Sequence, residues 1–164
     1  MKLVLVAVLL LIPAVVGAAA AGAAAVREAT AAPLFAWVPA GGYEDPFPFG
    51  ECTWWAAYNR RVSWNGDARE WLTNAARQGV ATTSVPSVGA IAVYKGGGEY
   101  SELGHVAVVV AVTPTAYAVS EMNAAAGPGR VSTRVIPWPD PAVEGFIPLS
   151  EGEMHPRATL AATR

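Results

Sequence analysis

The stretch GHVAVVVAV, residues 104–112, is apolar at every position after its histidine. Side chains of a strand point alternately to its two faces, so an unbroken apolar run predicts a strand that is covered on both sides. Such a strand lies in the middle of a sheet. This stretch therefore decides the fold class, because the rest of the domain has to be arranged around a buried strand.

Short runs that favour strands surround this stretch, each bounded by turn residues. They are Ala90 to Tyr94, Tyr117 to Met122, Val131 to Ile136 and Val143 to Ile147. Residues 113–115 (TPT) and 127–129 (GPG) separate neighbouring runs as tight hairpins do. The second half of the chain therefore predicts an antiparallel sheet.

Upstream of the sheet, apolar residues recur at intervals of three or four, which indicates helices. The first expected helix runs from Cys52 to Val62, and the second runs from Ala68 to Gly79 after an N-cap region at residues 65–67. Helices followed by an antiparallel sheet define an α+β fold. About 120 residues remain after the N-terminal segment, which is enough for one domain.

Residues 1–26 have the composition of an export signal, since no charged residue lies between Lys2 and Arg27. The Leu- and Val-rich start and the small residues after it suit a cleaved signal peptide, while the whole stretch is long enough to anchor the chain in a membrane. Both interpretations stay open. Either one places the rest of the chain outside the cytoplasm, because Lys2 favours the cytoplasmic side.

Two further segments are expected to lie outside the folded domain. Residues 27–46 are rich in Pro and Gly and are expected to form a linker. Residues 150–164 show no pattern and are expected to be a disordered tail, in which His155 is solvated. The net charge of −2, without a cluster of Lys and Arg, argues against nucleic acid as a partner.

Cys52 is the only cysteine of the chain, so no intrachain disulfide can form. A lone cysteine is often an inert core residue. An unpaired thiol in an oxidising compartment nevertheless suggests a function. Cys52 begins the first expected helix, where unpaired N–H groups and the helix dipole favour a thiolate. The residue is therefore interpreted either as an inert core thiol or as a nucleophile.

A nucleophilic thiol needs a base, and His105 is the only histidine inside the expected domain. If the following hairpin is centred near Pro114, strand pairing places His105 opposite Asn123, with Glu121 one diagonal step away on the same face. A carboxylate there would hold the imidazole in one tautomer. The alternatives are a histidine that belongs to the core or caps a turn, and a glutamate that is solvated.

The segments GECTWW at 50–55, GHVA at 104–107 and SEMN at 120–123 together resemble the CHAP domain. This family comprises cysteine- and histidine-dependent amidohydrolases and peptidases with a papain-like fold. The resemblance implies a catalytic domain over residues 47–149, in which N-terminal helices pack on an antiparallel sheet of five or six strands.

The resemblance also implies a peptidoglycan hydrolase that cleaves an amide bond, either an N-acetylmuramoyl-L-alanine amidase or an endopeptidase of stem peptides or cross-bridges. The family's catalytic residues correspond to Cys52, His105 and Glu121, and Asn123 corresponds to a polar residue that assists the imidazole. Many members carry Gln where this chain has Glu51, which cannot donate a hydrogen bond when it is ionised. A catalytically weak module that binds or helps to assemble the cell wall is therefore the alternative.

No cofactor or metal is expected. Some phage members bind calcium through an acidic loop before the cysteine, but residues 42–46 offer too few oxygen ligands here. One cysteine and one histidine in the domain are also too few for the common zinc sites. Hydrolysis of an amide outside the wall, such as a polyamine conjugate, is a third interpretation, against which the expected export argues.

Overall fold

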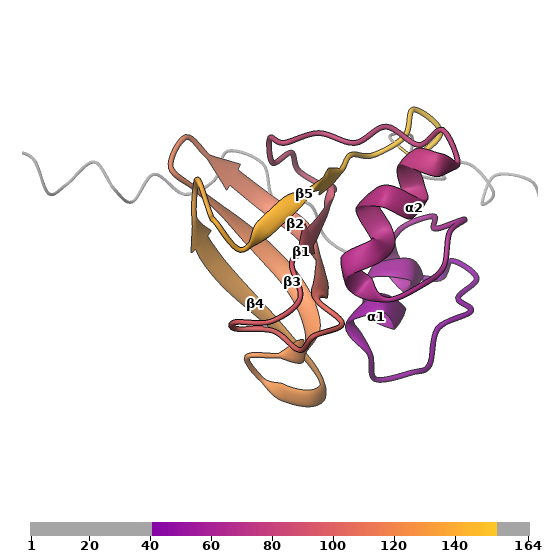
Figure 1. Ribbon diagram of the computed structural model, residues 1–164, viewed down its shortest axis with the longest axis horizontal. Helices are drawn as coiled ribbons and strands as arrows, with labels where there is room; N and C mark the ends of the chain where they lie inside the picture. The colour runs from indigo at the N-terminus through magenta and orange to yellow at the C-terminus, as the bar shows by residue number, and fades with distance from the viewer. Residues whose placement is uncertain (1–40, 154–164) are drawn as a thin grey trace, which may run out of the picture. The chain divides into compact units, whose positions relative to one another are not determined.

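The computed structural model describes residues 41–153, which form two short helices and a five-stranded antiparallel sheet (Figure 1). The helices are α1 (Cys52–Asn59) and α2 (Trp71–Arg77), and a 3-10 turn, η1 (Ala68–Glu70), leads into α2. The strands are β1 (Ile91–Tyr94), β2 (His105–Thr113), β3 (Ala116–Ala124), β4 (Gly127–Pro137) and β5 (Val143–Ile147). The predicted α+β, papain-like fold is confirmed.

Strand β2 lies at the centre of the sheet, whose order is β4-β3-β2-β1-β5. Its side chains alternate between two apolar clusters, as the unbroken hydrophobic run predicted. Val106 and Val108 point to one face, while Ala107 and Val109 point to the other. Both faces are therefore buried around β2, which explains why the strand needs no polar position.

Both helices cover the same face of the sheet (Figure 1). Trp71 of α2 is fully buried there and packs edge-on against Trp64, with ring centroids 5.8 Å apart. Burial of one such ring contributes on the order of 2 to 3 kcal/mol. The helical stripe that predicted α2 is therefore the surface that joins helix and sheet.

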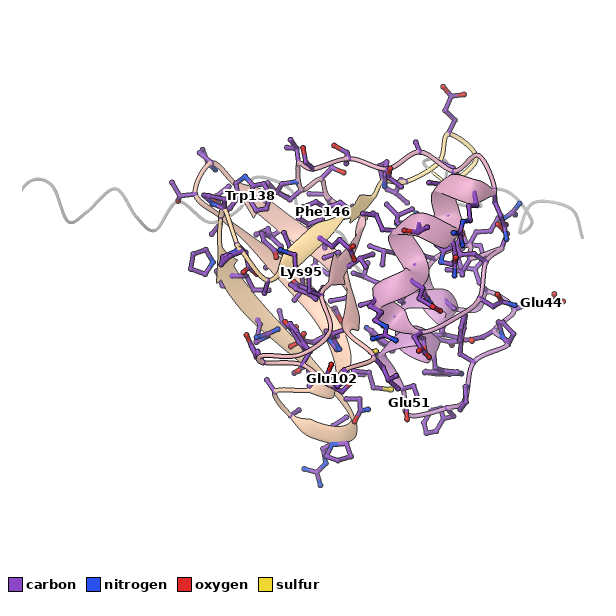
Figure 2. The ribbon with its side chains drawn as sticks, in the orientation of Figure 1. Glu44, Glu51, Lys95, Glu102, Trp138 and Phe146 are labelled. Carbon is purple, nitrogen blue, oxygen red and sulfur yellow. The ribbon has the colours of Figure 1, made fainter. Side chains whose placement is uncertain are left out.

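The face of the sheet away from the helices carries an aromatic cluster. Phe146 of β5 lies 5.5 Å from Tyr117 of β3 and 5.5 Å from Trp138, in both cases edge to face. Trp138 follows β4, and its ring lies away from the two helices (Figure 2). These contacts connect strands near the two edges of the sheet. Together with the apolar side chains of β1 to β3 on the same face, they form the second hydrophobic cluster of the core.

Two predicted boundaries are wrong by a few residues. The turn between β3 and β4 is formed by Ala125 and Ala126, whereas residues 127–129 already belong to β4. Helix α1 ends at Asn59 because Arg60 adopts an extended conformation. Its buried guanidinium donates hydrogen bonds to the carbonyl oxygens of Gly89 and Pro148.

The first residues of the expected tail, 150–153, contact the domain. Glu153 forms a hydrogen-bonded ion pair with Arg60, 3.0 Å from its Nε, and also accepts a bond from the backbone N–H of Ser150. Residues 150–153 therefore pack on the domain. Residues 1–26 and most of the expected linker lie outside the described residues, as does His155. Between residues 41 and 153, no helix has the length and apolarity needed to cross a bilayer.

Candidate active site

Cys52 is the first residue of α1 and lines a cavity of about 720 Å³. The chain reaches this position through Gly50, whose φ of 100° lies in the region that glycine favours, and through Glu51 in extended conformation. The thiol is buried, with 9% of the residue exposed. The side chain is therefore mostly shielded from solvent beside the cavity.

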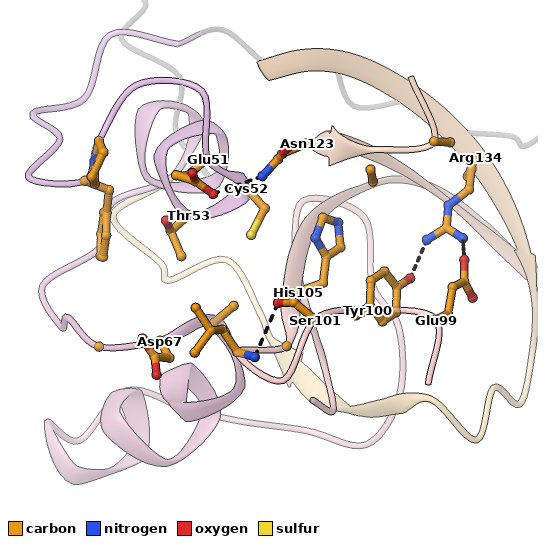
Figure 3. A pocket seen from close by; sticks show the side chains of 18 residues that line it. Glu51, Cys52, Thr53, Asp67, Glu99, Tyr100, Ser101, His105, Asn123 and Arg134 are labelled. Atoms are coloured by element: carbon orange, nitrogen blue, oxygen red, sulfur yellow. Dashed lines mark hydrogen bonds and ion pairs between the residues drawn. The ribbon is translucent and has the colours of Figure 1, made fainter. Parts of the chain in front are cut away.

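His105 opens β2 on the opposite wall of this cavity, and the Cys52 sulfur points toward its imidazole (Figure 3). The thiol and the imidazole interact closely enough for Cys52 to raise the pKa of His105. The ring nitrogen Nε2 lies 3.1 Å from Oε2 of Glu121. Because Nε2 is engaged by Glu121, Nδ1 is the nitrogen that is available to the thiol.

Strand pairing explains why Glu121 reaches His105. Strands β2 and β3 are antiparallel, and Val108 is paired with Ser120. From this pair, the start of β2 lies beside the end of β3. Residues two apart share a face, which puts His105 on the face of Ala107 and Glu121 on the face of Val119. Both belong to the face away from the helices. The hairpin thus brings the predicted histidine and glutamate together.

The charges of this pair support each other. Burial opposes protonation of His105, but hydrogen bonds to Cys52 and Glu121 outweigh it and raise its pKa to about 9. Burial would likewise raise the pKa of Glu121, but its bonds to His105 and Arg134 outweigh that effect and lower it. An imidazolium between a carboxylate and a thiol is therefore the favoured state near neutral pH.

Asn123 is hydrogen-bonded to Glu51. Its amide nitrogen donates a hydrogen bond to Oε2 of Glu51, 3.0 Å away, and both side chains line the cavity. The φ of 62° makes Asn123 a non-glycine residue in the left-handed region, a strained conformation that is concentrated at functional sites. The imidazole is instead contacted by Glu121 and, on its ring face, by Tyr100.

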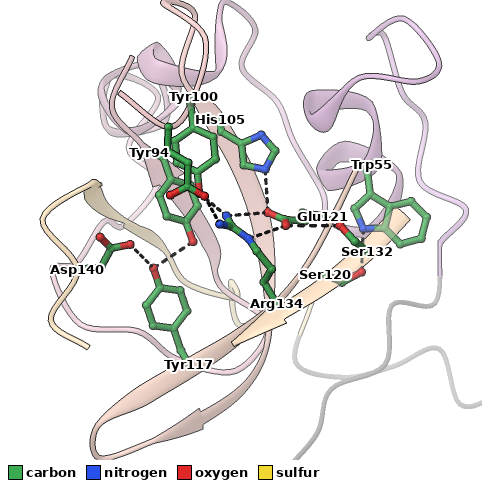
Figure 4. Close-up of polar contacts among 11 residues, drawn as sticks. Trp55, Tyr94, Tyr100, His105, Tyr117, Ser120, Glu121, Ser132, Arg134 and Asp140 are labelled. Carbon is green, nitrogen blue, oxygen red and sulfur yellow. Dashed lines mark hydrogen bonds and ion pairs between the residues drawn. The ribbon is translucent and has the colours of Figure 1, made fainter. Parts of the chain in front are cut away.

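Arg134 and Tyr100 are site residues that sequence reasoning missed. Arg134 of β4 donates two hydrogen bonds to Glu121, and Tyr100 stacks on the ring of His105 (Figure 4). Neither residue lies in the segments 50–55, 104–107 and 120–123 that carry the family resemblance. Side chains alternate along β4, but the sequence does not say which alternate set faces the core, so it could not predict that Arg134 points inward.

The cavity is suited to a covalent reaction at a carbonyl. It holds a thiol, an imidazole beside it and the start of a helix, whose first N–H groups have no partner within the helix. Its rim is mixed, with the apolar Leu103 and the acidic Asp67 and Glu99. Among residues 41–153, no three His, Cys, Asp or Glu side chains gather as metal ligands would.

Comparison with known proteins identifies relatives with cell-wall names. N-acetylmuramoyl-L-alanine amidase sle1 of Staphylococcus haemolyticus is 37% identical over 109 residues, which cover 60% of this chain and 31% of that protein. The probable autolysin SsaALP of Staphylococcus aureus is 33% identical over 114 residues, which cover 64% of this chain and 41% of that protein. The chain therefore spans well under half the length of these curated relatives.

The model of the CHAP domain family matches residues 42–123, which is half of the chain. The match contains Cys52, His105, Glu121 and Asn123 and ends before β4. By this match, the chain belongs to the CHAP domain family.

Proposed function

We propose that this protein is a cysteine-dependent hydrolase that cleaves an amide bond of peptidoglycan outside the cytoplasm. The observation that carries the proposal is that Cys52 and His105 line one cavity, with Glu121 3.1 Å from Nε2 of the imidazole. A thiol, a base and a group that orients the base are the parts that nucleophilic catalysis at a carbonyl requires. The names of the relatives supply the substrate class.

In the proposed reaction, the Cys52 thiolate attacks the carbonyl carbon of the amide and forms a tetrahedral intermediate. The His105 imidazolium then gives its proton to the departing amine, and the C–N bond breaks to leave a thioester on Cys52. Water attacks this thioester, His105 takes its proton, and the thiolate is released with a carboxylic acid product. Glu121 keeps the imidazole oriented and stabilises its charge throughout.

The oxyanion of the intermediate would be stabilised by the backbone N–H of Cys52, at the start of α1. Glu51 cannot add a donor in its ionised form. The amide of Asn123, which Glu51 holds at the cavity wall, is a donor of the right kind nearby. We infer that Asn123 donates a hydrogen bond to the oxyanion or to the substrate, and that it does not orient the imidazole.

Of the two bonds considered, the one between the muramoyl carbonyl and the nitrogen of L-alanine is favoured. Two of the relatives carry the name of that amidase. Cleavage there releases a new amine on L-alanine. Cleavage within a stem peptide or cross-bridge would instead release a different amino group, so the products distinguish the two activities by mass.

The proposal is tested by incubating the purified chain with sacculi and with a defined muropeptide, and by identifying new amino groups by mass spectrometry. The native chain should release L-alanine amines. Cys52→Ala should lower the rate at least about a thousandfold, as loss of a catalytic nucleophile does. Release at the native rate by Cys52→Ala would rule out the proposed mechanism.

The two histidines provide a matched pair of controls. His105→Asn should abolish release because it removes the base, whereas His155→Asn should leave the rate unchanged. Equal loss in both variants would indicate a general effect of histidine replacement on the protein and would contradict the assignment of His105.

The alternative is a CHAP module that binds or helps to assemble the wall with little turnover. Glu51 favours it, because a carboxylate beside Cys52 opposes the negative charge of the intermediate. Retention of the native chain on sacculi without release of amines would support this alternative and exclude the hydrolase.

A further inference from the structure

We propose that Arg134 and Tyr100 are positioning residues that hold His105 and Glu121 in the arrangement needed for attack by Cys52. This inference rests on the function proposed above. Both residues lie outside the triad, and Arg134 also lies beyond residues 42–123, which the family model covers. Figure 4 shows the guanidinium of Arg134 between the carboxylate of Glu121 and the hydroxyl of Tyr100.

Arg134 donates hydrogen bonds to both carboxylate oxygens of Glu121. Its Nε donates to Oε1 at 2.8 Å, and a terminal nitrogen donates to Oε2 at 3.2 Å. Two parallel bonds from a planar guanidinium fix the position and the plane of a carboxylate. Oε2 is also the atom that contacts Nε2 of His105. The two bonds from Arg134 therefore fix the position of the oxygen that contacts the imidazole.

The charge of Arg134 matters because the side chain of Glu121 is completely buried. The reactive state would contain a thiolate on Cys52, an imidazolium on His105 and a carboxylate on Glu121. These three groups alone carry a net charge of −1 in a buried site, which is unfavourable. Arg134 completes a row of alternating charges and makes its sum zero.

Tyr100 fixes the ring plane of the histidine. Its ring is parallel to that of His105 within 3°, with centroids 4.7 Å apart. The Tyr100 hydroxyl accepts a hydrogen bond from Arg134, whose Cζ lies 5.6 Å from the centre of the same ring. One side chain thus contacts the imidazole with its face and the guanidinium with its hydroxyl, and so couples the two groups.

Other polar groups around the pair are few and come from three elements. Ser132 of β4 lies 3.5 Å from Oε1 of Glu121. Glu99, in the loop before β2, forms an ion pair with Arg134 and has 62% of its side chain exposed. Tyr94 of β1 packs 5.9 Å from His105, and burial raises its pKa far above neutrality, so it stays uncharged. Arg134 is therefore the cation that balances Glu121.

A purely structural role for Arg134, as a link between β3 and β4, makes a different prediction from a positioning role. Loss of a structural link lowers the folded fraction and scales activity down equally at every pH. Loss of the cation beside Glu121 instead raises the pKa of that carboxyl group, because burial favours the neutral form and Arg134 no longer counteracts it. The acid limb of any process that needs the Glu121 carboxylate then moves to higher pH.

The test uses the pH dependence of iodoacetamide labelling at Cys52, followed by the mass of the intact full chain. The readout is unambiguous because Cys52 is the only cysteine, and its rate follows the thiolate population. In Arg134→Gln the acid limb should move up by about one pH unit or more, the effect of losing a charge-assisted bond pair. Arg134→Lys keeps the charge without the fork and should show a smaller shift in the same direction.

Arg130→Gln is the matched control, since Arg130 is exposed on the same strand, and its limb should coincide with that of the native chain. An unchanged limb in Arg134→Gln, or labelling that is only slower at every pH, would overturn the inference. If Arg134→Gln does not fold by circular dichroism, Arg134→Lys decides in the same way: a shift supports the positioning role and no shift overturns it.

Tyr100 is tested by a pair of substitutions. Tyr100→Phe keeps the stacked ring and should label Cys52 within about threefold of the native rate, whereas Tyr100→Leu should lower the rate up to roughly tenfold, the range expected for loss of an aromatic contact. Equal rates in Tyr100→Leu and the native chain would contradict a role for the ring. Labelling needs no substrate, so a shifted limb in a chain that releases no amines would refute the hydrolase and not this inference.

Discussion

Glu51 places a carboxylate beside Cys52 in the chain, and both residues line the cavity. Its side chain accepts a hydrogen bond from Asn123 and is exposed to solvent. Negative charge that develops on a carbonyl oxygen during attack is destabilised by a neighbouring anion. At an exposed position solvent weakens this repulsion, so Glu51 should slow the reaction without abolishing it.

Glu51→Gln should therefore raise kcat/KM for a muropeptide by roughly fivefold, the effect of about 1 kcal/mol for a unit charge about 4 Å away in water. The glutamine keeps an oxygen that can accept from Asn123. Release of amines measured against substrate concentration checks the prediction. Glu44→Gln, which removes the charge of an exposed glutamate, should have no effect. A lower kcat/KM in Glu51→Gln would mean that the carboxylate assists the reaction.

Strand β2 depends on the glycine that precedes it. Gly104 has a φ of 76°, and a Cβ at this position would lie 2.7 Å from the carbonyl oxygen of Tyr94 and 2.8 Å from the backbone nitrogen of Arg69. Both contacts are with backbone atoms, which cannot move away without distorting β1 or η1. The close approach of three segments therefore sets where β2 begins and where His105 emerges.

Gly104→Ala should lower the free energy of unfolding by at least about 2 kcal/mol, because it adds left-handed strain to steric overlap. Urea unfolding followed by circular dichroism gives this value. Labelling of Cys52 should also slow in the folded variant, since His105 is displaced. Gly152→Ala is the control, because a Cβ there meets no atom within 4 Å and its φ lies outside the left-handed region. Equal stability of the two variants would contradict the proposed crowding.

At the scale of the whole molecule, two buried ion pairs connect distant parts of the chain. Arg60 at the end of α1 binds Glu153 beyond β5, and His105 of β2 binds Glu121 of β3. Burial opposes the charge of Glu153, but the bonds from Arg60 outweigh it and lower its pKa to about 2. The pKa of His105 is raised in turn to about 9.

These opposite shifts predict a plateau of stability between pH 4.5 and 6.5. Glu153 stabilises the fold fully above its ordinary pKa of 4.5, and this contribution is lost as the pH falls toward 2. His105 stabilises it fully below its ordinary pKa of 6.5, and this contribution is lost as the pH rises through 9. Urea unfolding across pH 2 to 10 measures both limbs. Glu153→Gln should flatten the acid limb, and His105→Asn should flatten the alkaline limb. A free energy of unfolding that rises between pH 6.5 and 9 would contradict the stabilising role of the His105 charge.

The α+β class, the central position of β2 and the proximity of His105 and Glu121 follow from the amino-acid sequence alone. Each follows from a local regularity. An unbroken apolar run is buried on both faces, and a tight hairpin pairs residues at equal distances from its turn. The position of Cys52 at a helix start also follows from the spacing of neighbouring apolar residues. These features depend on contacts within one element or between adjacent ones.

The surroundings of Cys52, His105 and Glu121 depend on how the whole chain folds. Val135 of β4 is 73% exposed, so its strand turns Arg134 rather than its valines toward the buried face, against the order that hydrophobicity alone predicts. Arg134 is paired there with Glu121 of the neighbouring strand β3, while Tyr100, in the loop before β2, stacks on His105. The pattern of residues 127–129 predicted the β3–β4 turn too late in the chain, and Tyr100 lies in a loop without periodicity, so neither contact could be derived from the sequence.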